Sequence, residues 1–162
     1  FEYFMKRISS LFFLGWFLPA KVYAVVSSLY FAAGSFGILQ SESSPWLFSI
    51  RYQPAKVWHT IRPEMGIMYT TKQQIFLHAG FVFDWVLSGF IVFSPHFSAG
   101  WYKRGKGKDL GFPVEFCSGL RLGCILGKNS RLGIDFFHLS NASLGSMNPG
   151  SESLALFFSK NI

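Results

Sequence analysis

Apolar and polar residues alternate through most of this chain, and the polar positions carry arginine and carboxylate residues in equal number. Such alternation predicts strands whose two faces differ in polarity. No lysine falls in the middle of a predicted strand. A solvated face usually carries lysine, whereas an enclosed polar interior favours arginine paired with carboxylates, so we predict a polar interior and an apolar exterior. The polar-face charges are Arg51, Arg62, Arg121, Arg131, Glu64, Asp84, Glu115 and Asp135.

Turn-forming residues divide the chain after residue 24 into eight such segments, and no helical period of useful length remains. Eight antiparallel strands can close into a barrel, which leaves no unpaired edge and can cross a bilayer. We therefore predict an all-β fold, an eight-stranded antiparallel transmembrane β-barrel. The alternative is a soluble barrel or sandwich with reversed faces, which would place the balanced charges in water. The predicted strands are 29–40, 46–53, 61–70, 74–85, 90–103, 111–126, 131–142 and 152–161.

Composition agrees with this fold class. The chain has 162 residues, of which 50% are hydrophobic and only 14% are charged. This balance excludes a disordered protein, and the length allows one domain. The 20 phenylalanines and 16 glycines favour strands and tight turns over helices.

The N-terminal residues 1–24 have the pattern of a signal peptide with a short upstream extension. Met5-Lys6-Arg7 supplies a basic start, residues 8–18 form an apolar run, and Pro19 ends that run. Val22-Tyr23-Ala24 then offers a small-residue cleavage site. A membrane helix is the alternative interpretation, although the run is short for one. We predict that residues 25–162 form the barrel.

Three polar residues interrupt the apolar face of the last two predicted strands. His138 and Ser140 continue the face of Leu132, Ile134 and Phe136, and Glu152 shares the face of Leu154, Leu156 and Phe158. We expect all three polar residues to lie close together on the outside, near one rim. Serine, histidine and glutamate can act as nucleophile, general base and orienting acid. The alternative interpretation is polar residues that merely lie at headgroup level.

The residues around this cluster resemble a known family. His138-Leu-Ser-Asn-Ala142 followed by Asn148-Pro-Gly-Ser-Glu152 is similar to the signature of the outer-membrane lipid A 3-O-deacylases, the PagL-type acyloxyacyl hydrolases. Residues 130–137 and 105–111 also resemble that family, so the similarity covers roughly the last third of the chain.

The resemblance implies a catalytic triad and a substrate. It implies His138 as base, Ser140 as nucleophile and Glu152 as orienting acid, with the Asn148 amide stabilising the oxyanion. It further implies a serine esterase that removes an ester-linked acyl chain from the 3-position of lipid A in lipopolysaccharide. We expect location in the Gram-negative outer membrane and contact with outer-membrane lipids, with a monomer or a homodimer left open, and neither a cofactor, a metal nor a nucleic-acid partner.

A basic segment lies in the longest predicted outer connection. Its cations are Lys103, Arg104, Lys106 and Lys108, with Asp109 as the single acid. This cluster could bind the phosphates of the substrate headgroup, and the alternative is a solvated loop.

Two rival functions remain open on the sequence alone. One is a non-catalytic barrel with an adhesion or structural role, and the other is a soluble lipocalin-like carrier.

Overall fold

The computed structural model describes residues 26–39, 44–55 and 61–162, and every regular element in them is a strand. No helix in these ranges is long and apolar enough to cross a membrane. The predicted signal peptide at 1–24 lies outside the described residues. The strands are β1 Ser28–Phe36, β2 Trp46–Gln53, β3 Ile61–Thr70, β4 Ile75–Phe83, β5 Trp85–Ser88, β6 Ile91–Lys103, β7 Val114–Leu126, β8 Ser130–Ser140 and β9 Ser151–Asn161.

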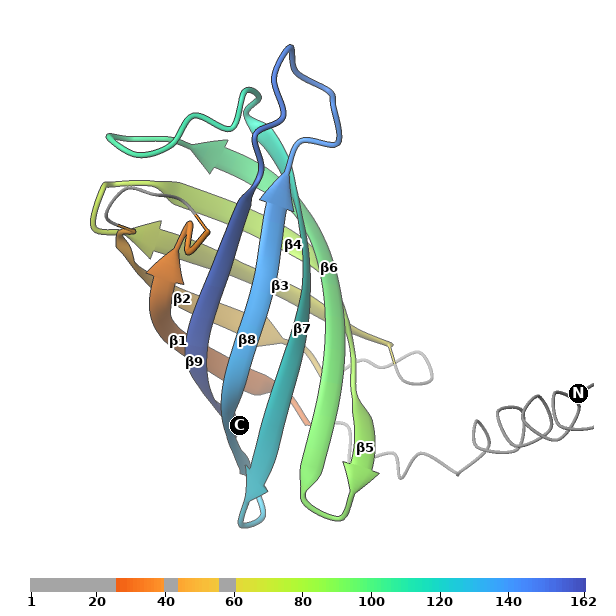
Figure 1. Ribbon diagram of the computed structural model, residues 1–162. Coiled ribbons are helices and arrows are strands. Elements are labelled where there is room, and N and C mark those ends of the chain that lie inside the picture. The colour runs from red at the N-terminus through yellow and green to blue at the C-terminus, as the bar shows by residue number, and fades with distance from the viewer. Residues whose placement is uncertain (1–25, 40–43, 56–60) are drawn as a thin grey trace, which may run out of the picture.

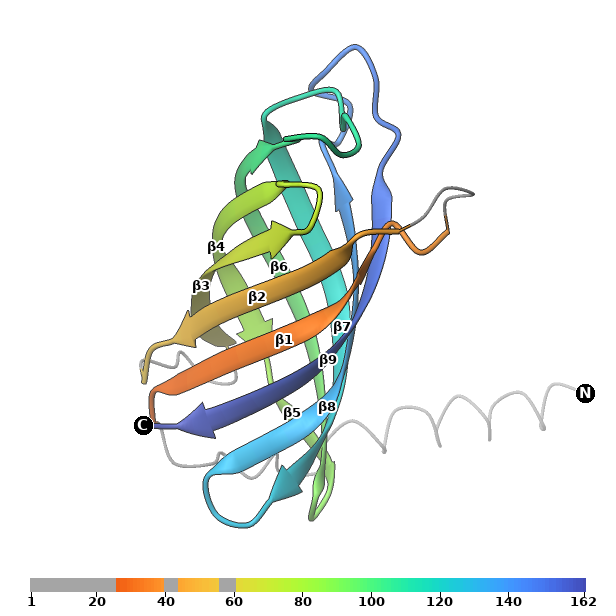
Figure 2. The ribbon, with the colours of Figure 1, turned by 90° about the vertical axis from the view of Figure 1, so that its left-hand side faces the viewer.

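The strands form one closed antiparallel barrel (Figures 1 and 2). Each strand pairs with the next one along the chain except β4, which pairs directly with β6, and β1 pairs with β9. Strands β4 and β5 are one strand interrupted only at Asp84, so the barrel has the eight strands that the sequence predicts. The predicted bounds 46–53 and 61–70 are confirmed, whereas the first strand ends four residues early, at Phe36.

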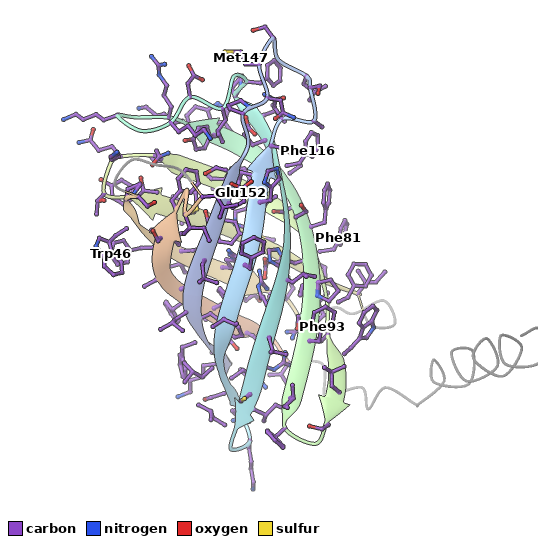
Figure 3. The ribbon with its side chains drawn as sticks, in the orientation of Figure 1. Trp46, Phe81, Phe93, Phe116, Met147 and Glu152 are labelled. Carbon is purple, nitrogen blue, oxygen red and sulfur yellow. The ribbon has the colours of Figure 1, made fainter. Side chains whose placement is uncertain are left out.

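Large apolar side chains cover the outside of the barrel. Trp46 is 64% exposed and Leu156 is 66% exposed, although both lie in regular strands. Figure 3 shows Trp46, Phe81, Phe93 and Phe116 pointing away from the barrel axis. A wall of this kind suits hydrocarbon and not water, so the predicted assignment of faces is confirmed.

The middle of the barrel interior is an ion-pair network centred on Asp135, which is fully buried. Its carboxylate accepts hydrogen bonds from the Tyr30 hydroxyl at 2.8 Å, Arg51 Nη1 at 3.0 Å and Arg121 Nε at 3.1 Å. The His96 ring nitrogen Nε2 lies 2.9 Å from the other carboxylate oxygen. These partners come from β1, β2, β6 and β7, so one β8 side chain links four other strands.

A second carboxylate completes this network. The Glu64 carboxylate of β3 accepts hydrogen bonds from both terminal nitrogens of Arg121, at 2.6 and 2.7 Å, in a bidentate pair. Gln53 donates to the same carboxylate at 2.7 Å. Paired geometry of this type compensates for the cost of removing charges from water.

Asp84 forms a separate cluster, nearer to the end of the barrel that holds the C-terminus. It accepts hydrogen bonds from Arg62 at 3.3 Å, Arg131 at 2.8 Å and Ser94 at 2.6 Å. The four predicted interior arginines therefore converge on three carboxylates. The fourth carboxylate, Glu115, is buried with no hydrogen-bond partner among the described residues, so the expected pairing of all eight charges is wrong for Glu115. Alternation predicts which face a residue occupies, but not its height along the barrel axis.

The two ends of the barrel differ in their connections. Residues 37–39 and 44–45, together with the connections 71–74, 104–113 and 141–150, lie at one end, which we call the loop end (Figure 1). The turns 89–90 and 127–129 lie at the opposite end with the C-terminus. Successive connections among the described residues thus alternate between the two ends.

The interior network yields a stability prediction. Arg121→Met removes one of the two arginines that pair with both buried carboxylates, Glu64 and Asp135, and leaves Arg51 as the other. We expect the free energy of unfolding to fall by about 3–5 kcal/mol, measured by urea titration of the barrel in lipid vesicles. The control is Arg104→Met, because Arg104 pairs with Asp109 on the exposed surface and its loss should cost less than about 1 kcal/mol. Equal losses in the two variants would contradict a structural role for the network.

Candidate active site

His138 and Glu152 face each other on the outer surface of the barrel near the loop end. They are direct partners in the β8–β9 ladder, and His138 Nδ1 lies 3.2 Å from Glu152 Oε1. Their side chains are 38% and 28% exposed, so the pair is partly open to its surroundings. Figure 3 shows Glu152 near the upper end of β9. The contact engages one ring nitrogen of His138 and leaves Nε2 as the nitrogen that can exchange a proton with another group.

Ser140 is the last residue of β8, two positions after His138 and therefore on the same face. Its ladder partner on β7 is Phe116, whose ring stacks on Phe97 of β6 with the centroids 6.0 Å apart. The serine thus lies beside an aromatic part of the outer wall. An apolar chain lying on that wall would pass next to the hydroxyl.

Ser118 is a polar residue on this face that the sequence analysis missed. It is exposed, and it is the β7 ladder partner of His138. His138 therefore lies between Ser118 on β7 and Glu152 on β9. The available signal was the gap that Ser118 leaves in the apolar series of its strand, between Phe116 and Leu120.

Gly150 packs against the ring of His138. A Cβ atom built on Gly150 would lie 2.6 Å from Cε1 and 3.1 Å from Nε2 of the imidazole, so only glycine leaves room for the ring in this position. Gly150 also has a φ of +54°, a conformation that other residues rarely adopt. The sequence pattern suggested a turn at this glycine, but not its contact with His138.

Asn148 and Asn141 are joined to each other. Asn148 Oδ1 accepts a hydrogen bond of 3.0 Å from the backbone N–H of Asn141, so the NH₂ of Asn148 is the end directed away from this contact. Asn141 is fully buried, which agrees with the inward direction that alternation predicts. Its own NH₂ donates to the carbonyls of Leu110 and Met147, both at 2.7 Å, and thereby joins connections 104–113 and 141–150.

The four predicted headgroup cations have different surroundings. Lys103 and Lys106 are exposed, and Arg104 pairs with Asp109 at 2.7 Å. Lys108 instead points at the site: its ammonium donates to the Gly150 carbonyl at 2.6 Å and more weakly to that of Pro149 at 3.4 Å. Burial lowers the pKa of Lys108 from its ordinary value, and the Glu152 carboxylate opposes this shift. The structure thus separates Lys108 from the other three.

Lys72 is a half-buried cation that lies beside the exposed cations at the loop end. Its backbone carbonyl accepts a hydrogen bond of 2.8 Å from the backbone N–H of Lys106, which brings the β3–β4 turn beside the basic segment. This lysine was not among the predicted site residues, because only the closed barrel makes the two connections neighbours.

No group of three or more His, Cys, Asp or Glu side chains suited to a metal ion occurs in ranges 26–39, 44–55 and 61–162. The arrangement instead offers a serine hydroxyl, an imidazole and a carboxylate on one lipid-facing surface, with a side-chain amide nearby. Groups of these types can carry out acyl transfer.

Comparison with known protein families shows which family the chain belongs to. The profile described as "Lipid A 3-O-deacylase (PagL)" matches residues 37–161, which is most of the chain. The chain belongs to the lipid A 3-O-deacylase (PagL) family. It is therefore an ester hydrolase of the outer membrane, and the resemblance found in its last third extends over nearly the whole barrel.

Solved structures agree with the PagL-family fold. The crystal structure of the outer membrane enzyme PagL is 19% identical, covers 83% of this chain and 99% of that chain, and has a TM-score of 0.65. A de novo designed transmembrane β-barrel is 12% identical, covers 85% of this chain and 95% of that chain, and has a TM-score of 0.56. No curated protein matches the chain in a sequence search.

Proposed function

We propose that this PagL-family enzyme hydrolyses the ester-linked acyl chain at the 3-position of lipid A, with Ser140, His138 and Glu152 as a catalytic triad. The observation that carries the proposal is the contact between His138 and Glu152 on the outward face of the barrel. Ser140 lies on the same face, two residues after His138 on β8. Polar groups on a lipid-facing wall are costly. Their retention as a complementary pair beside a serine therefore favours a catalytic role.

The first half of the reaction forms an acyl-enzyme. His138 Nε2 takes the proton of the Ser140 hydroxyl while Oγ attacks the ester carbonyl carbon. Glu152, on Nδ1, stabilises the imidazolium that results. The carbonyl oxygen becomes an oxyanion, to which the Asn148 NH₂ donates. The tetrahedral intermediate then collapses, the bond to the sugar oxygen breaks, and His138 returns its proton to that oxygen.

Water completes the cycle. His138 removes a proton from a water molecule, whose oxygen attacks the acyl carbon bound to Ser140. Collapse of the second intermediate releases the fatty acid and returns the proton to the serine oxygen. The reaction needs no redox step and no cofactor.

The position of the site suits a substrate that stays in the bilayer. Phe136, Leu154 and Leu120 lie on the outer wall close to His138 and are 41%, 43% and 50% exposed. Acyl chains can lie along these side chains while the sugar headgroup remains at the rim. Lipid A then reaches Ser140 by lateral diffusion.

Homodimer formation stays a prediction.

Exposed and half-buried cations around the loop end are proposed to hold the anionic headgroup. Lys103 and Lys106 supply two of these charges, Lys72 adds a third, and Arg104 shares its charge with Asp109. Exposed contacts of this type are individually weak and are screened by salt. Their combined effect should therefore be on substrate binding and not on the chemical step.

The triad predicts a specific pattern of losses. Ser140→Ala and His138→Ala should each lower kcat by at least about a thousandfold, because each removes a group that takes part in bond formation. Glu152→Ala should lower it less. The measurement is mass spectrometry of lipid A after incubation with each folded variant. Substantial deacylation by Ser140→Ala would exclude the covalent mechanism, and a wild-type protein that leaves lipid A intact would favour the non-catalytic barrel.

Headgroup binding predicts a change in KM. The double variant Lys103→Met/Lys106→Met should raise KM for phosphorylated lipid A severalfold at low salt, with kcat unchanged. The control substrate is a phosphate-free ester, for which the change should be smaller. The same KM change with both substrates would leave these lysines without a role in phosphate recognition.

Membrane orientation gives a third test of the function. The proposal requires the loop end to face the outside, where the substrate headgroup is found. Lys106→Cys should react with an impermeant thiol reagent on intact cells, whereas Lys128→Cys, in the opposite turn, should not. Both variants should be made in a background with Cys117 and Cys124 replaced by serine. Labelling of Lys128→Cys alone would place the site in the inner leaflet and contradict the proposed function.

A further inference from the structure

Lys108 occupies a different position from the other cations of its loop. Its ammonium lies 2.6 Å from the Gly150 carbonyl, the distance of a strong charge-assisted hydrogen bond, and 3.4 Å from the Pro149 carbonyl. Lys108 is also partly buried, whereas Lys103 and Lys106 are exposed. Two of its three N–H donors are thus directed at protein backbone, which leaves little capacity for a phosphate.

The carbonyl that Lys108 holds belongs to the residue that touches the proposed base. Gly150 lies against the Cε1 and Nε2 edge of the His138 ring, and Glu152 lies against Nδ1. The imidazole is therefore confined on two sides by the same short stretch of chain, residues 150–152. A shift of that stretch would move both contacts of the ring at once.

Other contacts between the two connections lie farther from the ring. Asn141 joins Leu110 to Met147, and Gly111 packs directly against the Met147 carbonyl. These contacts hold connection 141–150 near its middle. Lys108 is the contact from the β6–β7 connection that reaches the end of 141–150 next to His138.

We propose that Lys108 is a positioning residue for His138. Through the Gly150 carbonyl it holds Gly150 against the imidazole edge, and thereby keeps Nε2 directed for proton exchange with Ser140. This inference rests on the proposed function of His138 as base. It also reassigns Lys108, which the sequence alone groups with the headgroup cations.

Kinetics separate positioning from headgroup binding. Lys108→Met should lower kcat by roughly ten- to a hundredfold with both phosphorylated lipid A and a phosphate-free ester, since misplaced catalytic groups slow the chemical step. KM should stay near the wild-type value. Lys108→Arg should recover most of kcat, because a guanidinium can donate to the same carbonyl. Lys128→Met removes a lysine at the opposite end of the barrel and should behave as wild type.

Two kinetic results would overturn the inference. One is an unchanged kcat in Lys108→Met. The other is a higher KM for phosphorylated lipid A alone, which would make Lys108 a headgroup contact like Lys103 and Lys106. Heat-modifiable migration of each variant on a gel shows that the barrel is folded, so a loss of kcat is not a loss of protein.

Imidazole NMR tests the same inference without turnover. In protein with ¹⁵N-labelled histidine, the His138 signals are assigned by their absence in His138→Gln. We expect Lys108→Met to shift or broaden these signals, Gly150→Ala to do the same from the other side of the contact, and Lys128→Met to leave them unchanged. Unchanged His138 signals in Lys108→Met would overturn the positioning role.

The two measurements also distinguish this inference from the proposed function. If wild-type protein releases no fatty acid from lipid A but Lys108→Met still moves the His138 signals, the esterase proposal fails and the contact stands. If wild-type protein deacylates lipid A but Lys108→Met changes neither kcat nor the His138 signals, the esterase proposal stands and the positioning role fails.

Discussion

The ion pairs between Asp135, Glu64 and two arginines inside the barrel are the contacts on which the outer site depends. Asp135 points inward from β8 and is held by residues of β1, β2, β6 and β7. Three residues later on the same strand, His138 points outward to Glu152. A slip of β8 by one residue would turn Asp135 into lipid and His138 into the interior. The buried charges thus also specify the face on which the site lies.

The site is a set of polar side chains at the boundary between the apolar outer wall and the polar loop end of the barrel. Below it the wall is apolar, and above it the connections carry exposed cations. His138 and Glu152 satisfy each other, which lowers the cost of holding polar atoms against lipid. The loops above are joined by Asn141 and Lys108, so Gly150, which packs on the imidazole from outside the regular strands, has a defined position.

Much of this could be predicted from the sequence because alternation is a local property. Each strand reports its two faces within a few residues, which is why the eight strands, the enclosed arginines and the outward direction of His138, Ser140 and Glu152 follow without coordinates. Alternation does not predict which side chains pair with one another. Glu115 has the right parity for the interior ion pairs but pairs with no arginine in the described part of the chain, because it lies at the loop end of β7, six residues before Arg121.

The sequence by itself thus determined the class of barrel, the face of each residue and the family signature that includes the site. Only the tertiary structure decided which side chains meet across strands and connections. Ser118 beside His138, Lys72 beside Lys106, and Lys108 on the Gly150 carbonyl each join segments that are distant in the chain. The physical reason is closure: strand pairing and the stagger between strands set the height of every residue, and no local pattern encodes that height.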